Sequence, residues 1–304
     1  RMNRAPLVFW LIHSIYHHTS ELITPVDVYA WFSRLSGLVF LVLSGMISRA
    51  WAEDRFHSTI LFLLLVSQGY VQLFFGYVET YAILFPAMSA YLLLCDHAQR
   101  GRVPVYVPAA VLGLMVPLHF VTLAVFPALL WVAWARPSEG LQSRTISSLG
   151  VLALPAVTLL TLNLIGLGPG SLVYSEPGSH TIPLFGDLLV HHPHRLFSFG
   201  HIVQILNQYA LVAPATLICI GLLATGFDRH DPRDVMLLLA AGPLVVFTVL
   251  FNPAIGAFRD WDAFALPALP LTLLSVRCFI RGYSNGSSFR AAAILVVALS
   301  AVHT

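Results

Sequence analysis

The sequence predicts an all-α, polytopic transmembrane helix bundle, and three observations lead to this fold class. Of the 304 residues, 58% are hydrophobic and only 10% are charged, whereas soluble domains carry about 25% charged residues. Apolar runs of roughly 20 residues, the length that a helix needs to cross the hydrocarbon core, recur along the chain. Arginines gather in alternate connections between these runs. This composition excludes a soluble enzyme.

We expect about ten spans by this length criterion, all within one transmembrane domain covering residues 1–304. The expected spans are 28–48, 58–75, 79–95, 103–118, 119–135, 146–166, 203–226, 235–252, 263–280 and 291–304.

Arginine positions predict the orientation, because short cytoplasmic loops hold the positive excess. The alternate connections assigned to the cytoplasm contain Arg49, Arg55, Arg100, Arg102, Arg136, Arg144, Arg229, Arg233, Arg277, Arg281 and Arg290. The opposite face keeps Arg1, Arg4, Arg34, Arg195 and Arg259. The formal net charge of +2 gives no signal for nucleic acid, so the bilayer itself is the expected partner.

Four extracytoplasmic pieces follow from this orientation: residues 1–27, 76–79, 167–202 and 251–262. Within the first piece, histidines and Glu21 interrupt the apolar stretch 6–23, which favours an interfacial helix over a span. The long loop 167–202 mixes Pro, Gly and His with apolar residues, so we expect short helices or a lid there.

The strongest candidate site lies in the segment FNPAIGAFRDWDAFALPALP, residues 251–270. Arg259, Asp260 and Asp262 are ionisable groups at the mouth of a span, where such groups are functional candidates. The planar guanidinium of Arg259 suits a lipid-linked phosphate, and Asn252 lies close by in sequence. The alternative is a self-neutralising cluster that anchors a helix end.

Two further candidates lie in the first half of the chain. Glu79, in GYVETYA next to Tyr81, begins an expected span, and it is either a helix-capping acid or a functional one. His119 lies between two short expected spans. Helices of 16 or 17 residues rise about 25 Å, less than the roughly 30 Å core, so His119 is expected to face a cavity; a hydrogen-bonded packing role is the alternative.

Histidines crowd the segment HHPHRLFSFGH, which contains His192, His194, Arg195 and His201. Histidine is the commonest metal ligand, but no carboxylate or cysteine stands at a familiar spacing, so zinc is only weakly indicated. A phosphate or sugar-hydroxyl site suits these donors at least as well. No resident metal is assigned, and a divalent metal stays open as a cofactor.

Five stretches occur in an order that is typical of one enzyme class. They are RAPLVFWLIHSIY, VYAWFSRLSGLVFLVLSGMISRAW, GYVETYAIL, LMVPLHFVTL and RDWDAFALPALPLTLL. Together they resemble the GT-C class of polyprenyl-phosphate-sugar-dependent membrane glycosyltransferases, which includes protein O-mannosyltransferase-like and aminoarabinose transferase-like enzymes. The third stretch matches the pattern of this class at Tyr81 but lacks its arginine.

The resemblance implies a transferase in a bacterial inner membrane, with functional loops outside the cytoplasm. The residues singled out above supply the candidates for this activity: Arg259, His119, His192, His194, Arg195, His201, Tyr81 and Asn252 for substrate binding, and Glu79, Asp260 and Asp262 as catalytic candidates that position the acceptor or a metal. Enzymes of this class place the principal acid, an Asp or Glu, in the first extracytoplasmic loop just ahead of a Pro-Pro-Leu stretch. In this sequence the position of that acid falls before residue 1, and the class also has a first span ahead of that loop.

The leading hypothesis is therefore transfer of a sugar from a polyprenyl-phosphate donor. One alternative is a non-catalytic scaffold subunit, with other membrane subunits as partners and with histidines that contact a pigment or haem. A transporter is a second alternative, although the halves of the chain show no convincing inverted repeat.

Overall fold

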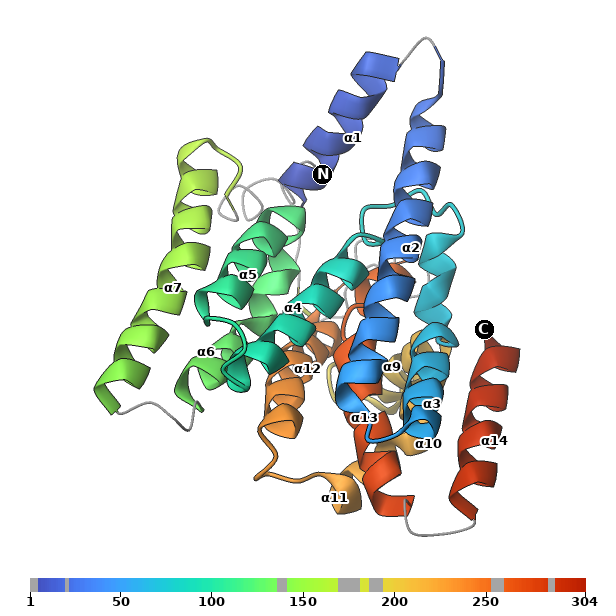
Figure 1. Ribbon diagram of the computed structural model, residues 1–304. Coiled ribbons are helices and arrows are strands. Elements are labelled where there is room, and N and C mark those ends of the chain that lie inside the picture. Colours follow the sequence, from blue (N-terminus) through green and yellow to red (C-terminus); the bar gives the residue numbers. More distant parts are fainter. Residues whose placement is uncertain are drawn as a thin grey trace. The chain divides into compact units, whose positions relative to one another are not determined.

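A computed structural model describes residues 5–19, 22–135, 141–168, 181–185, 194–252, 260–283 and 288–304. Within these ranges the regular structure is helical, apart from one antiparallel bridge between Thr181 and Phe251, which confirms the all-α prediction (Figure 1). The helices are α1 (Pro6–Thr19), α2 (Pro25–Trp51), α3 (Arg55–Val66), η1 (Gly69–Phe74), α4 (Leu84–Gln99), α5 (Tyr106–Leu118), η2 (Phe120–Val125), α6 (Phe126–Trp134), α7 (Leu141–Leu164), α9 (Phe199–Val212), α10 (Pro214–Cys219), η3 (Ile220–Leu222), α11 (Leu223–Gly226), α12 (Pro232–Leu250), η4 (Trp261–Phe264), α13 (Ala268–Tyr283) and α14 (Ser288–His303).

Every expected span coincides with helical structure, but not every one is a single helix. In the part of the chain that the structure describes, α2, α12 and residues 144–164 of α7 are long and apolar enough to cross a membrane. The expected span 58–75 is broken between α3 and η1, and the span 203–226 is broken between α9 and α10. Continuous helices were the wrong prediction at these two places.

The chain divides into two compact units. Unit 1 comprises the described residues of Arg1–Leu43, Leu73–Glu176 and Arg229–Ala240. Within it α5 packs against α4, α7 and α1, and α6 packs against α7 (Figure 1). Unit 2 comprises those of Ser44–Gln72, Pro177–Asp228 and Ala241–Thr304. There α13 packs against α3, α10 and α11, and α14 packs against α3 and α10.

The N-terminal helix α1 confirms that the stretch 6–23 begins as a helix. Val8 and Ile12 are spaced four residues apart, so they share one helix face, and both are buried with Val28 of α2. Exposed His13 and His17 lie on other faces. Burial of one apolar stripe thus fixes α1 to unit 1.

Proline breaks the second discontinuous helix of unit 2. Pro214 cannot donate a backbone hydrogen bond, and its ring disfavours helical geometry at the preceding residue. Ala213 accordingly adopts φ −147° and ψ 61°, and α10 begins anew at Pro214. The first N–H groups of a new helix have no intrahelical acceptor, so that of Ala215 needs a partner from elsewhere.

Gln68 supplies that partner from the break between α3 and η1. Its side chain is fully buried, and its Oε1 accepts from the Ala215 N–H at 3.2 Å. The Nε2 of Gln68 donates to the Leu64 carbonyl at 2.6 Å and to Ser300 Oγ of α14 at 3.0 Å. Both broken helices and α14 are therefore joined through one amide.

Gly69 allows the two breaks to approach each other. A Cβ at this position would lie 1.7 Å from the Leu211 carbonyl oxygen, a backbone atom near the end of α9. No side chain fits there, so the contact needs glycine for its lack of a Cβ and not for an unusual backbone angle.

We predict that Gly69→Ala destabilises the protein, because the new methyl group must displace the α9 backbone. Overpacking of this kind costs about 1–3 kcal/mol or more. The matched control is Gly242→Ala in α12, where an added Cβ meets no atom within 4 Å and the helix gains propensity. Thermal unfolding in detergent, followed by tryptophan fluorescence, should show a lower midpoint for the first variant only. Equal midpoints would contradict the contact.

Candidate functional site

Glu79 lies outside a helix, which excludes the capping interpretation for α4. It occupies the bend 78–80, whereas α4 begins at Leu84 and has Ile83 as its N-terminal cap, without a side-chain hydrogen bond. The Glu79 side chain is half-buried. The functional role of Glu79 stays a prediction.

His119 joins α5 to η2 in an extended backbone conformation, with φ −168° and ψ 128°. Its Nδ1 accepts from the Val121 N–H at 3.2 Å, and its carbonyl accepts from the Thr122 hydroxyl at 2.8 Å. Because a backbone N–H can only donate, Nδ1 carries the lone pair and the neutral ring holds its proton on Nε2. His119 is thus a helix cap that presents a donor, as the packing alternative requires.

Tyr81 lies against His119, so unit 1 brings together two of its predicted site residues. Their ring centroids are 5.1 Å apart, with an interplanar angle of 35°. His119 is buried, with 9% of its surface exposed. The expectation that His119 lines a cavity stays a prediction.

His201 ties α9 to the end of α12 in unit 2. It is almost fully buried, and its Nε2 donates to the Val249 carbonyl at 2.9 Å, since a carbonyl can only accept. Ser198 caps α9 by accepting from the His201 N–H. This geometry gives His201 a positioning role at the N-terminus of α9.

His194 and Arg195 lie just before α9. The His194 imidazole packs over Gly200, where a Cβ would lie 2.6 Å from its Cε1. The Arg195 side chain is exposed, while its carbonyl accepts from Ser198 Oγ at 2.8 Å. His192 lies outside the described residues.

Asn252, Asp260 and Asp262 gather at the same end of unit 2. Asn252 follows Phe251, whose ring lies 6.4 Å from that of Phe264 in η4. Asp260 precedes η4, and buried Asp262 lies in its first turn. η4 packs against α9, the helix that contains His201. Arg259, the predicted phosphate ligand, lies outside the described residues.

No group of three His, Cys, Asp or Glu side chains within the described ranges is placed to hold a metal ion. The structure therefore adds no ligand set to the weak zinc indication from the sequence.

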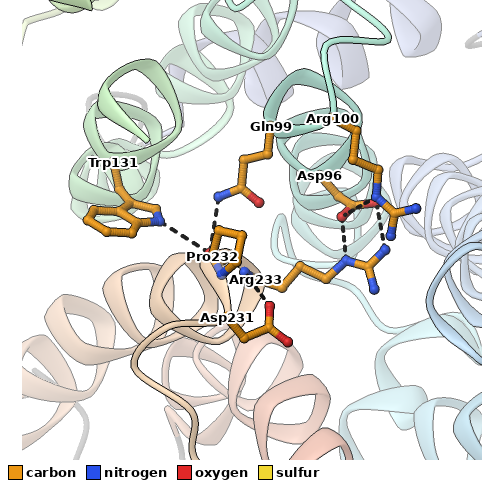
Figure 2. A network of polar contacts seen from close by, with 7 residues as sticks. All are labelled: Asp96, Gln99, Arg100, Trp131, Asp231, Pro232 and Arg233. Carbon is orange, nitrogen blue, oxygen red and sulfur yellow. Dashed lines mark hydrogen bonds and ion pairs between the residues drawn. The ribbon is translucent and has the colours of Figure 1, made fainter. Parts of the chain in front are cut away.

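A buried carboxylate that the sequence analysis overlooked organises unit 1 (Figure 2). Asp96 of α4 is 1% exposed, and both Nε and Nη2 of Arg233 in α12 donate to it, the latter at 3.4 Å. Arg100 Nε approaches the same carboxylate at 3.2 Å. A buried charge is tolerated only with such partners.

Neighbouring polar contacts hold the start of α12 in the same place. Gln99 Nε2 and Trp131 Nε1 both donate to the Pro232 carbonyl, at 3.1 Å and 3.2 Å. The Arg233 N–H donates to Asp231 Oδ1 at 2.9 Å (Figure 2). Three segments of unit 1 therefore meet at the N-terminus of α12.

The helix dipoles oppose both charges of this ion pair. Asp96 lies in the last turn of α4, which favours cations, and Arg233 lies in the first turn of α12, which favours anions. The Asp96 carboxylate is therefore stabilised by the guanidinium groups of Arg233 and Arg100, against the dipole of its own helix. An acid at the end of an apolar run was the available signal for Asp96, but its partner could not be read from the sequence.

Two solved structures resemble this chain over nearly its whole length. One is ArnT from Cupriavidus metallidurans bound to undecaprenyl phosphate, with a TM-score of 0.63, 16% identity, and coverage of 99% of this chain and 54% of ArnT. The other is ArnT of the same organism in the apo state, with a TM-score of 0.64, 17% identity, and coverage of 99% and 53%. The chain has the ArnT fold.

The GT-C-like arrangement predicted from sequence is thereby confirmed at the level of fold, as is a multi-pass membrane protein. The chain spans about half the length of ArnT. By sequence, no protein-family model and no curated protein matches it.

We predict that the hydrogen bond from the Val121 N–H to His119 Nδ1 stabilises the folded protein. His119→Leu removes the acceptor for the Val121 N–H and should cost about 1 kcal/mol, as other lost caps do. His119→Asn restores an acceptor and should unfold near the wild-type temperature. If both variants unfold alike, the cap contributes nothing.

We further predict that Asp96→Asn strongly destabilises the protein, because Arg233 then lacks its counter-ion. Breaking a buried pair costs about 3–5 kcal/mol, whereas replacing both partners by apolar residues, as in Asp96→Leu with Arg233→Met, should recover much of that loss. The control is Asp54→Asn at an exposed capping position, where Asn caps equally well. Unfolding midpoints of the wild type and these three variants test this, and a double variant no more stable than Asp96→Asn would refute the pairing.

Proposed function

We propose that this protein is a GT-C-type membrane glycosyltransferase that takes its sugar from a polyprenyl-phosphate donor on the extracytoplasmic side of a bacterial cytoplasmic membrane. The observation that carries the proposal is the ArnT fold over 99% of the chain, together with the undecaprenyl phosphate bound to one of the ArnT structures. The arginine distribution supports the orientation.

The reaction requires a base, a sugar donor and a stabilised leaving group. An acceptor hydroxyl attacks the anomeric carbon, the bond from that carbon to the phosphate oxygen breaks, and the configuration inverts. A carboxylate takes the hydroxyl proton, which is worth about 10²–10⁴ in rate. The polyprenyl phosphate departs with its negative charge, which a guanidinium stabilises.

We assign these roles to the predicted residues. Arg259 binds the donor phosphate, and Glu79, Asp260 or Asp262 positions the acceptor or takes its proton, beside the principal acid expected ahead of residue 1. The position of Glu79 outside α4 supports a role beyond capping. The buried Asp262 carboxylate and the cluster around it support a role for the 260–262 segment.

The remaining polar residues would orient the sugar and the phosphate. His119 presents an Nε2–H donor beside Tyr81, which suits a hydroxyl or a phosphate oxygen. Arg195 and His194, with His192, are cationic or donating groups ahead of α9. Asn252 and His201 would hold that neighbourhood in place, His201 through its bond to the α12 carbonyl.

The test is sugar transfer from a lipid-linked donor in membranes that contain the protein. Undecaprenyl-phosphate-linked mannose and aminoarabinose, each with a labelled sugar, serve as probes. We expect label to leave the donor for an acceptor, and Arg259→Ala to lower the rate at least about 100-fold, the scale of a lost electrostatic stabiliser. Arg259→Lys should retain part of it, because the charge stays but the fork is lost.

Arg102→Ala, an exposed arginine between α4 and α5, is the control that should leave transfer unchanged. Unchanged transfer in Arg259→Ala would reject the role of Arg259. No transfer with either donor by the folded wild-type protein would favour a scaffold, and uptake of substrate into proteoliposomes without a glycosyl product would favour a transporter.

A further inference from the structure

We propose that Arg34 and the turn at Gly76, both in unit 1, hold the phosphate of a membrane lipid at the N-terminal end of α2. In the predicted orientation this is the outer leaflet. The site is separate in sequence from Arg259, and the proposal does not depend on sugar transfer.

Helix geometry places Arg34 just inside the hydrocarbon boundary. The 20 residue steps from Trp31 to Trp51 of α2 rise about 30 Å, the thickness of the hydrocarbon core. Tryptophan prefers the two membrane interfaces, so Trp31 marks the level of the headgroups. Arg34 lies about one helical turn further in, from where its long side chain can reach back to that level.

Apolar side chains surround Arg34 on the exposed surface of unit 1. On α2 these are Trp31, Leu35 and Leu38, each between 58% and 60% exposed. The turn ahead of α4 adds Phe75, which is 79% exposed. An exposed apolar surface at this depth contacts lipid, so the charge of Arg34 faces acyl chains and headgroups instead of bulk water.

Among the described residues, no acid forms a hydrogen bond or an ion pair with the Arg34 guanidinium. Its central carbon lies 5.4 Å from the centre of the Trp31 ring. Asp27, two turns earlier on α2, interacts with Arg34 electrostatically, but its carboxylate accepts from the N–H and the hydroxyl of Thr24 at 2.9 Å and 2.6 Å, and so caps the helix. The donors of the guanidinium therefore still need an acceptor, and lipid phosphate is the anion at that level.

The turn at Gly76 holds the guanidinium in position. Ser33 Oγ of α2 donates to the Leu73 carbonyl at 2.6 Å and accepts from the Gly76 N–H at 3.2 Å, which fastens the turn to the helix. Gly76 has φ +91°, and a Cβ there would lie 3.4 Å from Arg34 Nη2. The guanidinium therefore lies between Trp31 and Gly76, and its planar fork matches two phosphate oxygens.

The occupant is a lipid and not free phosphate, because the exposed side chains beside Arg34 are suited to an acyl or prenyl chain. A soluble anion would gain nothing from Leu35, Leu38 and Phe75. Both the charge and the apolar surface then contribute to binding.

Native mass spectrometry of the full chain released from nanodiscs tests the site. The probes are phosphatidylglycerol, undecaprenyl phosphate, and digalactosyl diacylglycerol, which carries no phosphate. We expect the wild-type protein to retain one phosphate-bearing lipid that Arg34→Gln loses, with an affinity lowered about tenfold or more, the scale of a charge-assisted hydrogen bond. The lipid affinity of Arg34→Lys should lie between those of the wild type and Arg34→Gln, because lysine keeps the positive charge but lacks the planar guanidinium.

Arg102→Gln removes an exposed arginine outside the apolar surface and should retain the lipid. Equal retention by Arg34→Gln and Arg102→Gln would overturn the proposal. So would retention of the galactolipid as strong as that of the phospholipids, or displacement of the lipid by millimolar inorganic phosphate. Unfolding midpoints confirm that each variant is folded, and the readout is independent of any transferase activity.

Discussion

The hydrogen bonds of the Gln68 amide are the interaction on which unit 2 depends. Two helices are interrupted inside an apolar bundle, and each interruption leaves backbone groups that lipid cannot satisfy. Gln68 Oε1 accepts a hydrogen bond from one such group, the Ala215 N–H at the start of α10, and Gln68 Nε2 donates to Ser300 in α14. The close approach of Gly69 to α9 makes this possible. At these two breaks the irregular backbone is lined by protein, as the membrane requires.

The sequence predicted helical segments well and helix continuity poorly. Hydropathy located all the apolar segments, because the cost of unsatisfied backbone groups in lipid forces each to be helical. It could not separate α9 from α10, although Pro214 was a usable signal. The break beside Gly69 had none, because the reason for glycine there is the Leu211 carbonyl, a residue far along the chain.

The sequence indicated which residues belong to the candidate site, but it did not reveal the structural role of each one. Tyr81 and His119 do meet, and η4, which contains Asp262, packs against α9. The capping function of His119 and the bond from His201 to Val249 are structural roles that single positions do not reveal. Asp96 escaped notice for the same reason, since the importance of a buried charge depends on a partner that only folding brings near.

The wide sequence separation within the Asp96 ion pair has a consequence for biosynthesis. Asp96 and Arg233 are 137 residues apart, so at about 5–20 residues per second the carboxylate is made roughly ten seconds before its principal counter-ion. Arg100, only four residues downstream, is the cation at hand during that interval. Nascent α4 therefore carries a neutralising group of its own, and Arg233 joins Arg100 at the carboxylate only after α12 has been made.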